Sequence, residues 1–143
     1  MNQYTGYSVR KYHPRAGYSS TVGTEALNYK NNYRVIRFSD VLLMASEALL
    51  RSGGSVGEAQ DYYARVVKRA MGDDYKVPAV SLDNIYKERR YEFAMEGIRY
   101  WDLVRTNQAK DFIKGWDDTK KYLPIPQSEI DKSDGHLVQN PHF

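Results

Sequence analysis

The chain contains no cysteine, and this absence removes two classes of protein at once. Disulfide frameworks need paired cysteines, and thiolate metal sites need several of them. Long apolar runs are also missing: the most apolar stretch, 41–50, includes Glu47 and is bounded by Asp40 and Arg51. Such a stretch is too short and too charged to cross a bilayer. The first residues are polar and tyrosine-rich, so we expect no signal peptide among them.

Charge of one sign is not concentrated anywhere in the chain. The 21 basic and 18 acidic residues give a net charge of +3, and the two signs are interleaved. Nucleic-acid-binding tails carry basic blocks, so this pattern predicts no nucleic-acid partner. Histidine is scarce, and His13, His136 and His142 lie in irregular segments without metal-ligand spacing. We therefore expect surface histidines, no metal site and no cofactor.

The helical periodicity of apolar residues decides the fold class. A length of 143 residues fits one domain. Residues 1–34 contain many turn formers and are predicted to be an irregular lead-in to the domain formed by residues 35–143. Apolar residues then recur at three- and four-residue spacing. They predict helices over about 34–51, 55–71, 81–107 and 108–114.

Short connections between these segments predict helical hairpins. Gly53 and Gly54 end the first helix, and Ser55 with Glu58 forms a capping box for the second. So short a turn makes the two helices antiparallel. The prolines of segment 122–126 push their predecessors out of the helical region and predict an extended piece. The prediction is an all-α, repeat-like array of hairpins, with an irregular lead-in and an extended proline-containing C-terminal segment.

Acids and arginines alternate along the predicted third helix. Arg89, Glu92, Glu96 and Arg99 fall within about 40° of one direction on a helical wheel. Carboxylates at successive four-residue steps are one way to build an acid/base pair. Arginines on the same side hold such acids ionised, however, which a general acid must avoid. We therefore predict a structural ion network with Arg89–Glu92 and Glu96–Arg99 pairs, and no enzymatic activity.

The aromatic residues offer the remaining candidates for ligand contact. Tyr100 and Trp101 follow the charged stripe and are predicted to belong to the core. Trp116 is flanked by loop formers, so it stacks on a sugar ring or packs back onto the helices. Tyr18, in a Gly-Tyr-Ser-Ser segment, is a second and weaker candidate for stacking on a glycan.

Four segments in order resemble one known family. Residues 37–49, RFSDVLLMASEAL, are similar to its RYADVLLMYAEAL segment, and residues 88–105, ERRYEFAMEGIRYWDLVR, to its ERR-EFA-EG-RYWDL-R block. The pieces YLPIP at 122–126 and QNP at 139–141 resemble its C-terminal signatures. On these motifs the chain resembles the C-terminal portion of a SusD/RagB family outer-membrane nutrient-binding lipoprotein. Ser39 and Ser46 stand where the family usually has alanine, and both are small enough for helix packing to survive.

The resemblance implies more than the residues alone predict. It implies tetratricopeptide-like hairpins and a non-catalytic glycan-binding surface lipoprotein, of which this chain would be a soluble fragment. Family members bind oligosaccharides and act with a SusC-like, TonB-dependent transporter at the outer membrane, which they reach only through the lipid anchor of the full-length protein. Two other interpretations stay open. A helical-repeat module that binds proteins is the main alternative, and a glycoside hydrolase is the more distant one.

Overall fold

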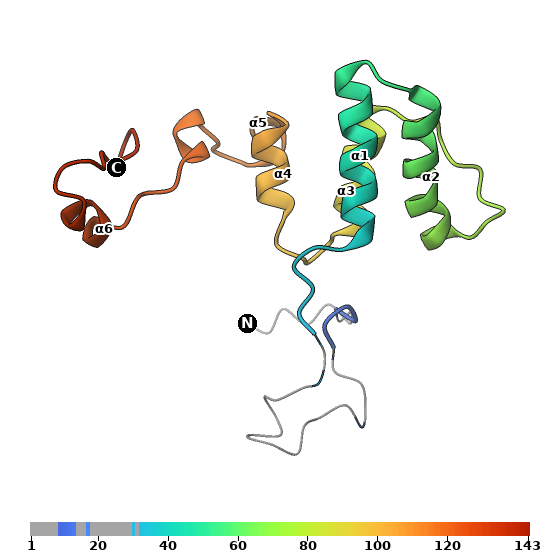
Figure 1. The fold of residues 1–143 in the computed structure, drawn as a ribbon, viewed down its shortest axis with the longest axis horizontal. Helices are drawn as coiled ribbons and strands as arrows, with labels where there is room; N and C mark the ends of the chain where they lie inside the picture. Colours follow the sequence, from blue (N-terminus) through green and yellow to red (C-terminus); the bar gives the residue numbers. More distant parts are fainter. Residues whose placement is uncertain (1–8, 14–16, 18–29, 31) are drawn as a thin grey trace. The chain divides into compact units, whose positions relative to one another are not determined.

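The computed structural model describes residues 9–13, 17, 30 and 32–143. Within these residues every regular element is a helix and there is no strand, as the sequence predicted (Figure 1). The chain divides into two compact units, Met1–Met95 and Glu96–Phe143. The predicted boundary at residue 34/35 stays a prediction.

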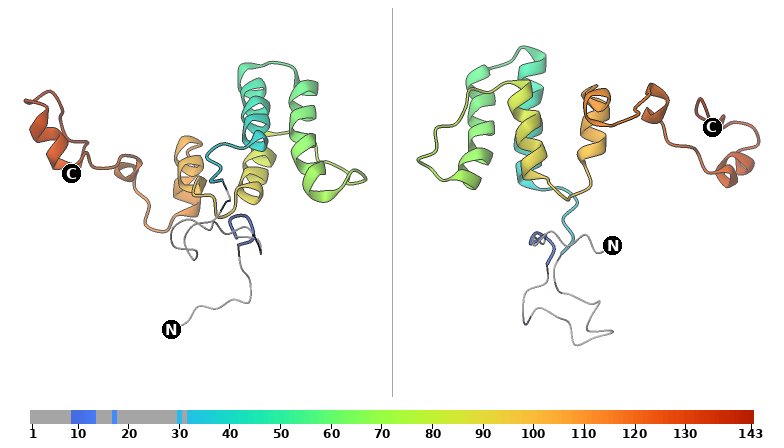
Figure 2. Two further views of the ribbon diagram at one scale, coloured as in Figure 1. Left: turned by 60° about the horizontal axis from the view of Figure 1, so that its bottom comes forward. Right: turned by 180° about the vertical axis from the view of Figure 1, so that it is seen from behind.

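The first unit is built on the predicted hairpin of α1 (Phe38–Ser52) and α2 (Val56–Met71). Gly53 adopts a left-handed φ of 71° and its N–H donates to the Leu49 carbonyl, which ends α1. Ser55 then caps α2 by accepting the Glu58 N–H at 3.2 Å. The two helices lie side by side and antiparallel, as two views show (Figures 1 and 2). The hairpin and its turn chemistry are therefore confirmed.

α3 (Leu82–Glu92) completes the first unit by packing against α1. It begins where predicted, because the Ser81 hydroxyl accepts the Asn84 N–H at 3.2 Å. α1 contacts both neighbouring helices and so lies at the centre of the packing. The buried apolar side chains of this unit are Leu42, Leu43, Ala59, Tyr63, Val66, Val67, Ile85 and Phe93.

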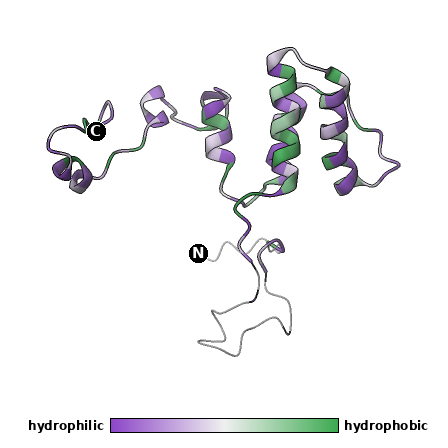
Figure 3. Ribbon diagram, viewed as in Figure 1, coloured by the Kyte–Doolittle hydropathy of each residue, from purple (hydrophilic) through white to green (hydrophobic). Residues whose placement is uncertain are grey.

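α1 is the most apolar helix, but its buried face differs from the predicted one (Figure 3). The three- and four-residue spacing of apolar residues over 34–51 predicts that Phe38 and Val41 are buried, but they are 63% and 44% exposed. Ser39, Ser46 and Glu47 are buried instead. The apolar residues of α1 cover more than one side of the helix, so periodicity alone does not select the side that its two neighbours cover.

The third predicted helix is wrong in its length. α3 ends at Glu92, and α4 begins only at Arg99 and runs to Arg105. Between them Met95 has a φ of 67° and Gly97 a φ of 81°, both in the left-handed region that a helix does not contain. Gly97 therefore allows a change of chain direction. The predicted stripe of Arg89, Glu92, Glu96 and Arg99 does not lie on one continuous helix.

The second unit contains short helices only. α4 is followed by α5 (Ala109–Phe112), a 3₁₀ turn η1 (Asp118–Lys121) and α6 (Gln127–Lys132). α5 contacts α4, as the predicted second hairpin required, although it is shorter than expected. Segment 122–126 is extended as predicted, with Tyr122 at φ −101° and ψ 144°.

The two C-terminal sequence motifs contact each other. The Gln139 amide accepts the Ile125 N–H at 2.8 Å and donates to the Ile125 carbonyl at 2.9 Å. The Asn140 amide donates to the Leu123 carbonyl at 2.6 Å. These bonds give partners to backbone groups that an isolated extended segment would leave without any. They give a structural reason for the pairing of YLPIP with QNP.

Candidate functional site

A charged cluster lies at the C-terminal end of α3. The Glu92 side chain is 5% exposed, and its Oε1 accepts Arg37 Nη1 at 2.7 Å. Its Oε2 accepts Arg69 Nη2 from α2 at 2.5 Å. Arg37 also donates to the Glu92 carbonyl at 2.9 Å, and Lys11 donates to the same oxygen. One buried acid therefore ties α3 to α2 and to the residues that precede α1.

A buried phenylalanine joins this acid to a second ion pair. Arg89, on α3, donates to Asp40 of α1 at 2.6 Å. The Phe93 ring receives the Arg89 guanidinium at 5.1 Å and the Arg37 guanidinium at 4.9 Å. Guanidiniums over an aromatic ring are attracted to its electron-rich face. The cluster thus combines paired charges with an apolar centre, as a desolvated helix contact requires.

The four residues of the predicted ion network lie in two different units. Arg89 and Glu92 lie in the cluster, with partners on other segments. Glu96 and Arg99 lie beyond the end of α3, in the second unit. There the Arg99 guanidinium lies 5.0 Å from the centre of the Phe112 ring, between α4 and α5. The Arg89–Glu92 and Glu96–Arg99 pairings stay predictions.

Sequence reasoning missed the charged members of the cluster that lie outside α3. Arg37, Asp40 and Arg69 lie far from α3 in the chain, so no helical wheel of α3 includes them. A signal was available at Arg37 and Asp40, since both charges stand at the start of an otherwise apolar helix. Each carboxylate oxygen of Glu92 accepts a guanidinium N–H, so this acid serves as a structural acceptor between segments.

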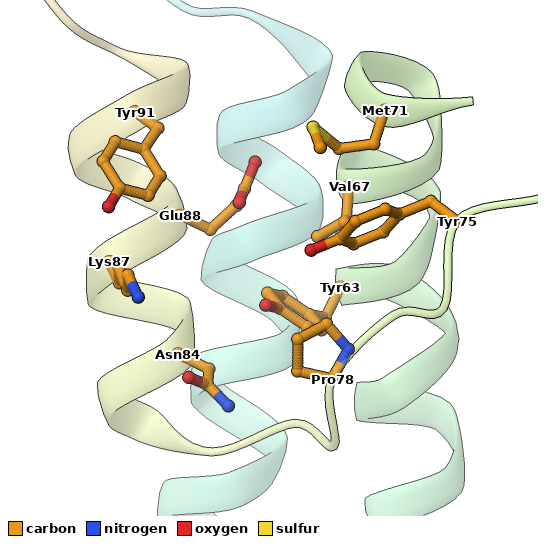
Figure 4. A pocket seen from close by; sticks show the side chains of 9 residues that line it. All are labelled: Tyr63, Val67, Met71, Tyr75, Pro78, Asn84, Lys87, Glu88 and Tyr91. Carbon is orange, nitrogen blue, oxygen red and sulfur yellow. The ribbon is translucent and has the colours of Figure 1, made fainter. Parts of the chain in front are cut away.

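A pocket opens between α2, α3 and the loop that joins them (Figure 4). Its volume is about 190 Å³. Tyr63 forms part of its wall and is 3% exposed, whereas Tyr75 and Tyr91 are 40% and 61% exposed. Its lining residues are Tyr63, Val67, Met71, Tyr75, Pro78, Asn84, Lys87, Glu88 and Tyr91.

Glu88, which lines this pocket, has a raised pKa. Burial raises the pKa of Glu88 and the nearby Glu92 raises it further, while Arg69 lowers it. Burial also raises the pKa of Tyr63, helped by Glu88 and Tyr75. Within the part of the chain that the structure describes, Glu88 has no hydrogen bond and no ion pair. A partly desolvated carboxylate beside two tyrosines is therefore available to a ligand.

Two of the aromatic residues considered in the sequence, Trp116 and Trp101, lie in the second unit. Trp116 is half-buried, with its ring edge-on to Tyr100 at 6.1 Å and its indole N–H donating to Asp118 at 3.3 Å. Trp101 is 50% exposed, so its prediction as a core residue is wrong. Tyr18 lies outside the described residues. Trp116 thus contacts the protein on one side, and its role in stacking stays a prediction.

The described ranges contain neither a metal-binding cluster nor a membrane-spanning helix. No three histidine, aspartate or glutamate side chains there come together in a way that would hold a metal ion. None of the helices there has the length and apolarity needed to cross a membrane. His13, His136 and His142 are exposed, as expected of surface histidines.

Comparison with solved structures places the fold. The chain is similar to surface glycan-binding protein A from Bacteroides thetaiotaomicron, with 44% sequence identity and a TM-score of 0.69. The similarity covers 83% of this chain and 26% of that chain. At this identity the likeness supports relationship as well as fold.

Comparison with curated proteins gives the same family. A SusD-like protein P2 of Formosa agariphila is 25% identical over 94% of this chain and 30% of its own length. A SusD-like protein of Bacteroides ovatus is 34% identical over 54% of this chain and 14% of its own length. The chain thus spans less than a third of the length of these relatives. The model of the SusD family matches residues 1–119, and the chain belongs to that family.

Proposed function

We propose that this chain is part of a non-catalytic surface lipoprotein that binds oligosaccharides and delivers them to a TonB-dependent, SusC-like outer-membrane transporter. The observation that carries the proposal is the similarity to a surface glycan-binding protein, at 44% identity and a TM-score of 0.69. The ion pairs of Glu92 with two arginines support a structural role for the charged cluster within that function. The lipid anchor and the cell-surface location belong to the same proposal.

Within that function the first unit acts as scaffold. The Glu92 and Arg89 ion pairs hold α1, α2 and α3 together, and no reacting group is needed for this. Trp116 and Tyr18 are proposed as aromatic contacts for sugar rings. A tryptophan that is half-buried against Tyr100 keeps a fixed orientation, which lowers the entropy lost when a ring stacks on it.

The proposal is tested by binding. A glycan array screened with the full-length protein, followed by calorimetry on the hits, should give saturable binding to at least one oligosaccharide class. Co-purification with the SusC-like transporter should give a stable complex on size-exclusion chromatography. Array and calorimetry without any saturable glycan would contradict the glycan-binding function.

A protein-binding repeat module is the second candidate, and one observation favours it. α1 exposes apolar side chains, with Phe38 at 63% and Met44 at 45%. Exposed apolar helix faces are common in modules that bind a partner helix. Peptide capture without glycan binding would support this candidate. Release of reducing sugars from any polysaccharide would instead support the hydrolase interpretation.

A further inference from the structure

The pocket between α2 and α3 is made entirely by the first unit and is separate from the charged cluster's paired acids. Its loop wall is fixed by Gln60, whose amide donates to the Pro78 carbonyl at 3.2 Å and accepts the Val80 N–H at 2.6 Å. Asn84 adds a bond from its amide to the Ala79 carbonyl at 2.9 Å. A wall that is already held in place loses little freedom on binding. The pocket is therefore a preformed site.

The polar groups around the pocket include both donors and acceptors. Glu88 offers carboxylate oxygens, and Asn84 offers its side-chain oxygen because its amide nitrogen already donates to Ala79. Lys87 offers an ammonium, and Tyr63 and Tyr75 offer hydroxyls (Figure 4). In Figure 4 the hydroxyls of Tyr63 and Tyr75 point toward the α3 side, where Glu88 lies. Such a mixed set matches a ligand that carries several hydroxyls.

The charges that line the pocket compensate each other. Glu88 is opposed by Lys87 in the lining and by the Arg69 charge nearby. A cationic ligand would gain from Glu88 but would be repelled by these two groups. An anionic ligand would be repelled by the Glu88 carboxylate. The electrostatics therefore favour a neutral ligand.

The rim of the pocket carries exposed aromatic and apolar side chains. Tyr75, Tyr91 and Met71 line the pocket and are 40%, 61% and 58% exposed. A pyranose ring has one edge of hydroxyls and one face of C–H groups, and aromatic rings bind the latter. The volume of about 190 Å³ is below the range of drug-sized sites and suits a single sugar ring.

We propose that this pocket binds one neutral pyranose ring of a glycan, with Tyr75 and Tyr91 against its C–H face and Glu88, Asn84 and Tyr63 as hydrogen-bond partners of its hydroxyls. The inference rests on the proposed glycan-binding function and locates a site for it. The site is distinct from the Trp116 and Tyr18 candidates. A lysine or arginine side chain of a partner protein is the competing occupant.

The test measures where sugars bind. Amide shifts of the 143-residue chain are followed by NMR during titration with glucose, galactose, mannose and xylose, and with the oligosaccharides that bind on the array. A sugar ring in the pocket should give saturable shifts within residues 63–91. Tyr91→Ala should weaken this binding by about tenfold, because one stacking face is lost. Tyr122→Ala removes a tyrosine that is 51% exposed in the second unit, and it should change nothing.

Two further variants separate the hydrogen-bond contribution from stacking. Glu88→Gln keeps the shape but loses the charge, and it should weaken binding severalfold. Glu129→Gln, at an exposed acid paired with Lys132 at 3.0 Å, is its control. Far-ultraviolet circular dichroism of each variant should match the parent, so that loss of fold is not read as loss of binding.

The outcomes distinguish the two proposals. Saturable sugar binding that leaves 63–91 unshifted and survives Tyr91→Ala would overturn the pocket while keeping glycan binding. No saturable sugar binding anywhere would overturn both. Shifts at 63–91 with an acetyl-lysine amide or acetyl-arginine amide, and none with sugars, would assign the pocket to the competing occupant and overturn the inference.

Discussion

Two carboxylates one helical turn apart on α3 lie in opposite surroundings. Glu92, at the end of the helix, accepts Arg37 and Arg69 and is 5% exposed. Glu88, four residues earlier, faces the tyrosine pocket and has a pKa raised chiefly by burial. The difference comes from the neighbouring segments, which supply arginines at one end and tyrosines at the other. The end with paired charges holds the helices together, and the end with an unpaired acid keeps a group available for a ligand.

Removing Glu92 should have the largest effect on stability. Glu92→Ala leaves Arg37 partly buried without its acid, and it deletes the link between α2 and α3. Because Arg69 is 61% exposed and can be solvated, we expect a loss of about 2–3 kcal/mol, at the lower end for a broken buried pair. Urea unfolding measures the change, and Glu129→Ala is the exposed control. Equal midpoints for the two variants would contradict the role of the cluster.

The Phe93 ring gives the next largest effect. Phe93→Leu keeps an apolar side chain in a site that is 4% exposed, but removes the face that two guanidiniums share. We expect a loss of about 1–2 kcal/mol, from reduced packing and from the lost attraction. The same substitution at Phe112, which is 56% exposed and lies under the Arg99 guanidinium, should cost less. Thermal unfolding of both variants decides whether the second arginine contributes.

Two buried serines of α1 differ in the same way, because only one of their hydroxyls has a hydrogen-bond partner among the described residues. The Ser46 hydroxyl donates to the Ala59 carbonyl at 2.7 Å, whereas the buried Ser39 hydroxyl has no partner among the described residues. Ser46→Ala should therefore cost about 1 kcal/mol, and Ser39→Ala should raise stability by about 0.5–1 kcal/mol. Two single variants and their double variant, compared by denaturant unfolding, test this. A loss of stability in Ser39→Ala would mean that its hydroxyl is satisfied.

The sequence predicted best those features that depend on residues adjacent to one another along the chain. The Gly53 stop, the Ser55 and Ser81 caps and the extended segment 122–126 all follow from local backbone chemistry, and all were predicted. The end of α3 was missed because Phe93–Ile98 continues a helical pattern of residues. The positive φ values of Met95 and Gly97 reveal the break, and such a φ is uncommon for a methionine.

The candidate sites depended on contacts that no local pattern contains. Arg37 and Arg69 lie 55 and 23 residues from Glu92, so their pairing with it is a property of the packing. The pocket combines α2, a loop and α3 for the same reason. The sequence identified neither Glu88 as a pocket residue nor the tyrosines that surround it. The family resemblance supplied the function class without supplying these positions.

The smallest expected effect on stability belongs to Glu88 and depends on pH. Its raised pKa means that the folded state holds the proton more tightly than the unfolded state, in which the pKa is roughly 4.3. The stability that this supplies is fully present below the unfolded pKa and is lost as the pH rises through the folded pKa. At neutral pH the folded chain therefore carries the cost of a partly buried charge, which the nearby Arg69 reduces.

Glu88→Gln should accordingly unfold at a slightly higher temperature than the parent at neutral pH, and the gain should vanish on acidification. Glu129→Gln, at an exposed position, should show neither effect. A melting temperature for Glu88→Gln below that of the parent at neutral pH would mean that the acid has a partner in the folded state. If the variant is both more stable and weaker in binding sugar, the acid is retained at a cost in stability because the ligand needs it.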